Sequence, residues 1–202
     1  MRESLQALVR VIASTADQVN PDSNEVGTEL LRLRRALRSA VARDHFVASP
    51  LHDYAAILDC ALAGAKGQPL AGIGAALSAV RGVLPWTYHY ESRRGEEDLA
   101  SRIAFAELIG PDGPMDAPDA RIGFTLLAPR TLYPMHAHPA VELYWVLSGH
   151  ARWTSGHADA TVPPGAFVLH RCNEPHAMQT TDEPLLALWG WSGDIDSPAA
   201  YI

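Results

Sequence analysis

The chain has 202 residues, of which 48% are hydrophobic, so it can bury the core of one domain with an extension. Its formal net charge of -7 and pI of about 5.7 argue against a general nucleic-acid-binding protein, which would normally carry a basic face. The amphipathic start of the chain is unlike a secretion signal, and no apolar run approaches the roughly 20 residues that cross a bilayer. We therefore expect a cytoplasmic protein that binds neither nucleic acid nor membrane.

Helical periodicity predicts four helices in residues 1–82. The inward positions of the first three are apolar and three or four residues apart: Leu5, Leu8, Val9 and Ile12, then Val26, Leu30, Leu33 and Leu37, then Leu51, Tyr54, Ala55, Leu58 and Leu62. The third helix is expected to run from an N-cap at Ser49, with Pro50 in its first turn, to Gly64. The fourth is expected from about residue 70 to 81, with Gly82 ending it.

The arginine-rich stretch "LRLRRALR" (Leu31 to Arg38) alternates its charges with Leu33, Ala36 and Leu37. This pattern predicts a solvated face on the second helix. We expect residues 1–82 to cover the rest of the protein without performing chemistry. An apolar face left exposed on these helices could support a homodimer.

Residues 83–202 have the sequence pattern of a β domain. Short apolar or alternating runs recur, bounded by Gly, Pro or Asp: "WTYHYES", "RIAFAELIG", "RIGFTLLAP", "VELYWVLSG", "HARWTSG", "GAFVLH" and "PLLALWGWSG". Such spacing is typical of an all-β sandwich or barrel. The segment "GPDGPMDAPDA" (Gly110 to Ala120) is expected to be a loop. The sequence thus predicts a helical region (1–82) and a β-barrel that carries the site (83–202).

Titratable groups gather in "YPMHAHPAVELYWVLSG" (Tyr133 to Gly149). His136 and His138 project from the same face of a strand, and Glu142 shares that face if the strand is continuous. Imidazole and carboxylate suit a divalent first-row metal. His176, in "CNEPHAMQT", follows a Pro-Gly turn and a short strand and is the best candidate for a fourth ligand. A single histidine would more often be a hydrogen-bonded core residue, but this combination favours a metal site.

The same residues resemble the two cupin motifs. "HAHPAVELYWVLSG" is similar to the first motif, with His136, His138, Glu142 and Gly149 in place, and "PPGAFVLHRCNEPH" to the second, whose histidine falls on His176. The chain departs from the common second motif at His170, where many cupins have proline. The resemblance implies a single-domain cupin barrel, a double-stranded β-helix. It does not imply one reaction, because cupins include several kinds of enzyme and non-enzymes.

A narrower resemblance is to the DddQ-type dimethylsulfoniopropionate (DMSP) lyases. It rests on Tyr133, Tyr144, the "PHAMQT" ending, the helical N-terminal region and the chain length. The resemblance implies His136, His138, Glu142 and His176 as metal ligands, Tyr144 as catalytic base, and Tyr133 and Trp191 as pocket residues. It also implies one divalent transition metal: zinc is expected in a crystal, with iron or manganese as alternatives.

The implied reaction is a β-elimination that converts DMSP to dimethyl sulfide and acrylate. A base must remove a proton from the carbon next to the carboxylate, and a metal bound to that carboxylate makes the proton more acidic. Tyrosine, with an ordinary pKa of about 10, becomes a better base beside a cation. Strand alternation turns Tyr144 toward Glu142 and Trp145 away from it. Trp189 and Trp191 share one face of the last strand, where aromatic rings could bind the sulfonium.

Two other functions stay open from the sequence: an iron dioxygenase that uses the same four ligands, and a non-catalytic cupin that binds a small molecule. A basic phenol at Tyr144 favours the lyase over both. His170 could support a ligand or belong to a lid, although a core or surface position is the simpler interpretation. The remaining histidines considered, His45, His52, His150 and His157, are interpreted as exposed.

Overall fold

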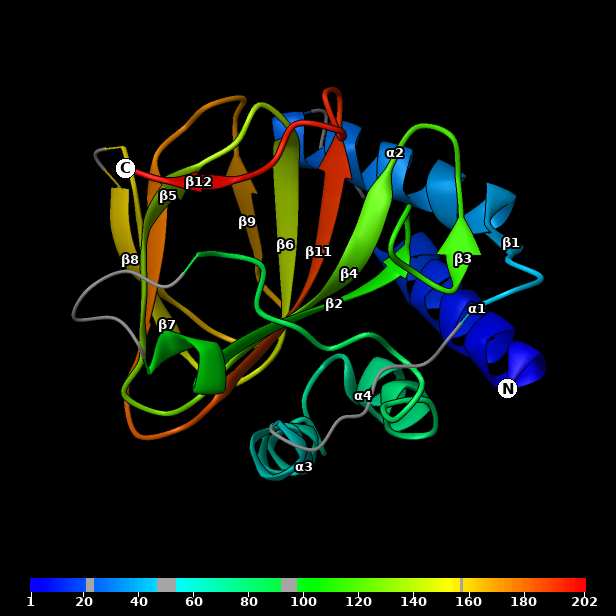
Figure 1. Ribbon diagram of the computed structural model, residues 1–202, viewed down its shortest axis with the longest axis horizontal. Coiled ribbons are helices and arrows are strands. Elements are labelled where there is room, and N and C mark those ends of the chain that lie inside the picture. The colour runs from blue at the N-terminus through cyan, green and yellow to red at the C-terminus, as the bar shows by residue number, and fades with distance from the viewer. Residues whose placement is uncertain (21–23, 47–53, 92–97, 157) are drawn as a thin grey trace.

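Two β-sheets face each other and form a barrel, and four helices cover the outside of the larger sheet (Figure 1). The computed structural model describes residues 1–20, 24–46, 54–91, 98–156 and 158–202. The larger sheet has the strand order β1-β3-β2-β4-β11-β6-β9, and the smaller one β12-β5-β10-β7-β8. The fold is therefore the mainly β cupin barrel with an α-helical N-terminal region that the sequence predicted.

The helices are α1 (Arg2–Gln18), α2 (Glu25–Ser39), α3 (Ala55–Gly64) and α4 (Ala71–Ser78), with a short 3-10 turn at Leu99–Ser101. The strands of the larger sheet are β1 (Val41–Ala42), β2 (Ile103–Ile109), β3 (Met115–Asp116), β4 (Arg121–Leu127), β6 (Val141–Ser148), β9 (Phe167–His170) and β11 (Leu185–Ser192). Those of the smaller sheet are β5 (Leu132–Ala137), β7 (Ala151–Ser155), β8 (Ala158–Val162), β10 (His176–Thr180) and β12 (Ala200–Tyr201).

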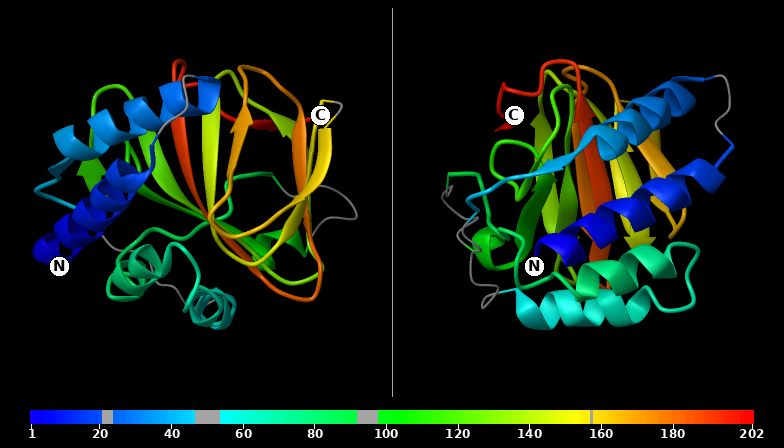
Figure 2. Two further views of the ribbon diagram at one scale, coloured as in Figure 1. Left: turned by 180° about the vertical axis from the view of Figure 1, so that it is seen from behind. Right: turned by 90° about the vertical axis from the view of Figure 1, so that its right-hand side faces the viewer.

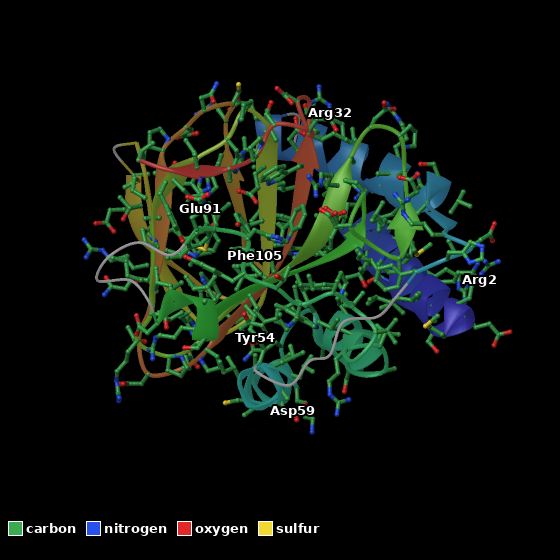
Figure 3. All side chains as sticks on the ribbon, in the orientation of Figure 1. Arg2, Arg32, Tyr54, Asp59, Glu91 and Phe105 are labelled. Carbon is green, nitrogen blue, oxygen red and sulfur yellow. The ribbon has the colours of Figure 1, made fainter. Side chains whose placement is uncertain are left out.

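Because side chains alternate along each strand, the two faces of the larger sheet pack into two different hydrophobic cores. Along β6, Leu143, Trp145 and Leu147 face the helices, whereas Tyr144 and Val146 face the barrel interior. The same alternation holds along β4 and β11, and along β2 as far as Leu108. A register shift between Glu107 and Ile109 then places Ile109 in the same core as Leu108. Phe105 of β2 lies inside the barrel, whereas labelled charged side chains such as Arg2 and Asp59 project from the periphery (Figure 3). The predicted outward direction of Trp145 is confirmed.

α1 and α2 cross the outer face of the larger sheet (Figure 2). Their predicted inner faces are buried, except that Val26 is only partly buried. Asn24 caps α2, because its Oδ1 accepts a hydrogen bond of 2.9 Å from the backbone N–H of Gly27. The solvated arginine face has one exception. Arg34 is buried and donates to the carbonyl oxygens of Ala16 and Val19, so it satisfies acceptors at the end of α1.

Several boundaries differ from those predicted. The fourth helix ends at Ser78 rather than near residue 81, and β3 interrupts the expected loop at 110–120. The run "WTYHYES" forms no strand in its described part, only a single bridge between Thr87 and Phe105. The third helix begins at Ala55, and the predicted cap at Ser49 and Pro50 lies outside the described residues. Several short strands, β1, β3, β8 and β12 among them, carried no clear sequence signal.

Gly149, which closes the first motif, makes the tight turn between β6 and β7. Its φ is +75°, a left-handed conformation that most side chains avoid. A Cβ at this position would lie 2.0 Å from the carbonyl oxygen of Pro184. Glycine is therefore required here by both conformation and space.

The division of the chain at residue 82 stays a prediction, as do the homodimer and the cytoplasmic location. β1 lies within residues 1–82 yet pairs with β3 at the edge of the larger sheet. Within the described residues, the helices are all too short or too polar to span a membrane.

Leu33 and Leu31 on α2 offer a matched test of how the helices stabilise the barrel. Leu33 is buried and fills the space beside Gly190 of β11, whereas Leu31 is 50% exposed. Leu33→Ala is expected to lower the free energy of unfolding by about 2–5 kcal/mol, and Leu31→Ala by less than about 0.5 kcal/mol. Urea denaturation of the two variants measures the difference. Equal small losses would mean that the helix contact contributes little.

Candidate metal centre and pocket

The candidate ligands come from both sheets and, for His138, from the connection between them. In the smaller sheet His136 of β5 is the register partner of His176 of β10. In the larger sheet Glu142 of β6 lies between Trp191 of β11 and His170 of β9. Directly paired positions project to the same side of a sheet. The fold thus sets two rows of side chains opposite each other.

The first motif does not lie on one continuous strand. Glu142 was expected to share the face of His136 and His138 only if that strand were continuous, and this condition is not met. β5 ends at Ala137 and β6 begins at Val141, and the two strands belong to different sheets. The chain therefore crosses from sheet to sheet between His138 and Glu142. Glu142 approaches His138 because of this crossing, not because of strand alternation.

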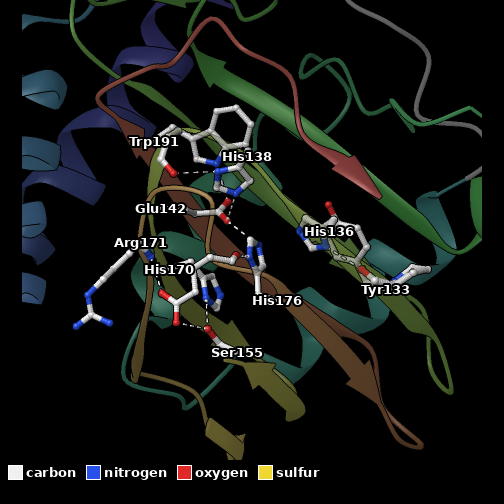
Figure 4. Close-up of polar contacts among 12 residues, drawn as sticks. Tyr133, His136, His138, Glu142, Ser155, His170, Arg171, His176 and Trp191 are labelled. Carbon is white, nitrogen blue, oxygen red and sulfur yellow. Dashed lines mark hydrogen bonds and ion pairs between the residues drawn. The ribbon is translucent and has the colours of Figure 1, made fainter. Parts of the chain in front are cut away.

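Three of the four predicted ligands converge closely (Figure 4). Ligand atoms of His138, Glu142 and His176 all lie within 4.8 Å of one another, and all three residues are buried. Glu142 Oε2 is 3.0 Å from His138 Nε2 and 3.3 Å from His176 Nε2. Such a group of two imidazoles and a carboxylate can hold a metal ion. The identity of the ion does not follow from this geometry.

Backbone carbonyl groups fix the orientation of the three histidine rings. The Nδ1 atoms of His136, His138 and His176 lie 2.8, 3.0 and 2.8 Å from the carbonyl oxygens of Pro134, Ala140 and Glu174. A carbonyl oxygen only accepts, so each Nδ1 is the donor and each Nε2 is left to bind elsewhere. Histidines that ligate metals are commonly held in this way.

The donor set also fits a cation electrostatically. With Nδ1 donating, the Nε2 of a neutral His176 is an acceptor, yet it faces an oxygen of Glu142, which is an acceptor too. His138 Nε2 faces the same oxygen. A proton or a metal ion is needed between such groups, and a metal ion satisfies both contacts at once.

His136 lies beside the group formed by His138, Glu142 and His176 and is not part of it. Its ring is stacked on Tyr133, with centroids 4.0 Å apart, and meets the ring of His176 at 4.0 Å. Burial, with the neighbouring His176 ring, lowers the pKa of His136 to about 3, so its imidazole is neutral at physiological pH. A neutral imidazole is the form that binds a metal.

A cavity of about 240 Å³ opens beside the cluster. The predicted residues Tyr133, Tyr144 and Trp191 line it together with His136, His138 and Glu142. Trp189 also lines it, and the absence of a side chain at Gly123 makes room for its ring, since a Cβ there would lie 2.5 Å from it. The cavity has the size of a small metabolite.

Trp191 has a second contact that the sequence did not suggest. Its Nε1 donates a hydrogen bond of 2.8 Å to Glu142 Oε1, and its ring lies 4.3 Å from that of His138. It therefore orients the carboxylate as well as lining the cavity.

Other lining residues were missed: His89, Tyr90, Phe105, Glu107, Asp112, Arg121, Thr125, Pro198 and Ala199. Most lie far from the motif in sequence, so spacing alone could not reveal them. A signal existed for Tyr90, whose run "WTYHYES" is rich in aromatic residues. Its hydroxyl group pairs with that of Tyr133.

Tyr144 lines the cavity and is buried. Burial, and then the negative charge of Glu142, raises the pKa of Tyr144 well above its ordinary value. The ring packs against Trp153, with centroids 4.8 Å apart. Without a bound cation the phenol is therefore protonated at neutral pH.

The other histidines considered in the sequence separate into three groups. His170 is fully buried, which excludes the surface interpretation. His45 and His150 are exposed, as predicted. His52 and His157 lie outside the described residues.

Metal binding is expected to weaken as the pH falls. Burial by itself lowers the pKa of His138, but the Glu142 carboxylate outweighs it and raises that pKa above 6.5. Burial likewise opposes ionisation of Glu142, yet His138 and His176 lower its pKa well below 4.5. The resulting ion pair stabilises the metal-free fold fully between about pH 4.5 and 6.5. This contribution is lost as the pH rises through the raised pKa of His138, and also as the pH falls from 4.5 through the lowered pKa of Glu142.

A metal ion that binds His138 must displace the proton that this histidine carries in its ion pair with Glu142. Affinity for Zn²⁺ should fall up to about tenfold per pH unit below the pKa of His138, with about one proton released per ion. Calorimetric titration in buffers with different protonation enthalpies measures that release. A zinc affinity that does not change between about pH 6 and pH 8 would show that His138 is not a ligand.

Together the barrel, the two motifs and the buried histidine–glutamate group define a protein of the cupin class with a candidate metal site. The chain belongs to the dimethylsulfoniopropionate lyase family, whose sequence model matches residues 28–187.

Two curated relatives support this family membership, and one crystal structure matches the fold. The chain is 37% identical over 129 residues to dimethylsulfoniopropionate lyase DddQ of Ruegeria pomeroyi, which covers 63% of this chain and 64% of the relative. It is 37% identical over 123 residues to a Cereibacter sphaeroides protein provisionally named dimethylsulfoniopropionate lyase DddL, covering 60% and 51%. The matches thus span between about half and two thirds of these relatives' length. The crystal structure of DddQ from Ruegeria pomeroyi DSS-3 matches the fold at a TM-score of 0.82 and 24% identity, over 100% of this chain and 97% of the other.

Proposed function

We propose that this protein is a metal-dependent lyase that cleaves DMSP to dimethyl sulfide and acrylate. The observation that carries the proposal is the cavity, in which a phenol, two tryptophans and the histidine–glutamate group surround a space for one small molecule. In a chain of this family, that arrangement provides a separate group for each task of a β-elimination. The curated relatives DddQ and DddL carry the name of this activity.

The proposed ligands are His136, His138, Glu142 and His176. The three histidines offer Nε2, because Nδ1 of each is hydrogen-bonded to a carbonyl group. Zinc, iron and manganese all suit imidazole and carboxylate ligands, and zinc is the first choice to test. When bound, the ion would supply the positive charge that polarises the substrate carboxylate and lowers the pKa of Tyr144.

Tyr144 is the proposed base. Its hydroxyl group faces the cavity from β6, two residues after Glu142, and its ring is held by Trp153. As phenolate it would take the proton from the carbon next to the substrate carboxylate. The electron pair of that C–H bond would form the double bond of acrylate, while the C–S bond breaks and dimethyl sulfide leaves with the bonding pair.

The aromatic lining is the proposed site for the sulfonium group. Trp191 and Tyr133 are fixed in place, the first by its hydrogen bond to Glu142 and the second by its stack on His136 and its contact with Tyr90. Aromatic rings whose rotation is restricted offer a preformed surface for a cation. Trp191 lies against His138 and Tyr133 against His136, so both rings line the cavity beside the proposed ligands and would keep the sulfonium there.

Product analysis tests this function. Purified protein loaded with Zn²⁺, Fe²⁺ or Mn²⁺ is mixed with DMSP, and dimethyl sulfide in the headspace and acrylate in solution are measured. Equal amounts of the two products, formed without consumption of oxygen, are expected. A sample treated with a chelator is the control. Oxygen consumption without dimethyl sulfide would instead indicate an oxygenase.

A further inference from the structure

His170 is a buried histidine for which the proposed reaction has no use. It is 0% exposed and ends β9, where its backbone is the register partner of Glu142. Its ring is stacked on the ring of His176, with centroids 3.8 Å apart and planes 7° from parallel. It therefore contacts two of the proposed ligands, one through its backbone and the other through its side chain (Figure 4).

A hydrogen-bond chain fixes the ring of His170. The Ser155 hydroxyl group donates to Glu174 Oε1 at 2.8 Å, so its oxygen can only accept from His170 Nδ1 at 3.2 Å. Glu174 in turn accepts the Nδ1–H of His176 on its carbonyl oxygen. Glu174 thus restrains both histidine rings, His176 directly through its carbonyl oxygen and His170 indirectly through Ser155, and the two ring planes are 7° from parallel.

A histidine at position 170 costs folding free energy, because one of its polar atoms is buried without a partner in the described part of the chain. With Nδ1 donating to Ser155, His170 Nε2 is an acceptor, and it is buried without a hydrogen-bond partner among the described residues. An apolar residue would fill the same space without that cost. Trp153 lies on another side of the ring, with centroids 5.9 Å apart and planes 23° apart. His170 therefore has two nearly parallel aromatic neighbours, Trp153 and His176.

We propose that His170 is a positioning residue for the metal centre, and that its ring sets the angle at which His176 presents Nε2 to the ion. A ring that is stacked on one face and hydrogen-bonded at Nδ1 has little freedom to rotate. His176 has both restraints, the first from His170 and the second from the Glu174 carbonyl group. The inference rests on the proposed metal centre.

Cobalt binding to metal-free protein tests the inference without an activity measurement. Co²⁺ affinity is measured by competition with a chromophoric chelator, and the visible absorption of the bound ion reports its coordination geometry. His170→Ala is expected to bind Co²⁺ about 10–100-fold more weakly and with an altered spectrum. His170→Phe keeps a flat ring against His176, so it should recover most of the affinity and the wild-type spectrum. His150→Ala, which removes an exposed histidine, is the matched control and should match wild type.

Each result decides between support and contradiction. Wild-type affinity and spectrum in His170→Ala would overturn the proposal, and so would a His170→Phe protein as impaired as His170→Ala, because the ring contact would then not be the cause. Thermal unfolding of each metal-free variant shows whether it is folded, and His170→Leu replaces His170→Ala if that protein is not. If wild-type protein bound no Co²⁺, the metal centre itself would be wrong and the inference would fall with it.

Discussion

Tyr144→Phe is expected to lower the rate of DMSP cleavage by at least about 10²–10⁴-fold, which is the range that a general base contributes. The substitution removes one hydroxyl group and keeps the ring, so the packing on Trp153 should be preserved. Metal content, measured by atomic emission on the purified protein, should stay near that of wild type. Binding of acrylate should also persist, because the proposed ligands are unchanged.

Tyr133→Phe is the control for this prediction. Tyr133 lines the same cavity and loses the same hydroxyl group, but its partner is Tyr90 and its ring stacks on His136. A pocket residue should change KM more than kcat. If Tyr133→Phe instead lost kcat by the larger factor and Tyr144→Phe did not, Tyr133 would be the base.

His176→Ala is expected to release most of the bound metal and with it the activity. The substitution removes one Nε2 of the proposed set and, among the described residues, leaves Glu142 Oε2 with His138 as its one close imidazole partner. Sites arranged for four ligands seldom hold their ion with three. Metal content after gel filtration is the measurement, with His150→Ala as a control of similar size on the surface. Full metal occupancy in His176→Ala would contradict its assignment as a ligand.

Much of the barrel could be predicted because its signals are local. Alternation along β6 placed Tyr144 inside and Trp145 outside, and the periodicity of α1 and α2 identified their buried faces. The short strands were harder. β12 has two residues and owes its place to pairing with β5, which is a contact made by tertiary structure and not by the sequence of Ala200 and Tyr201.

The candidate site was predictable only as far as its motif extends. Residue spacing led to His136, His138, Glu142 and His176, but the continuous strand on which the placement of Glu142 depended is absent, because the chain changes sheets before it. The hydrogen bond from Trp191 to Glu142 joins residues 49 positions apart. The buried stack of His170 on His176 likewise depends on how β9 and β10 face each other. Contacts of this kind become visible only when both sheets are in place.

DMSP carrying deuterium at both positions next to its carboxylate gives the most direct test of the central claim, which is that the metal-loaded protein removes a proton from this carbon. The products formed from it by the loaded protein are analysed by mass spectrometry and NMR. The account predicts dimethyl sulfide and an acrylate that retains one of the two deuterium atoms. A product such as 3-hydroxypropionate that retains both would contradict it, because its formation breaks the C–S bond without removing that proton.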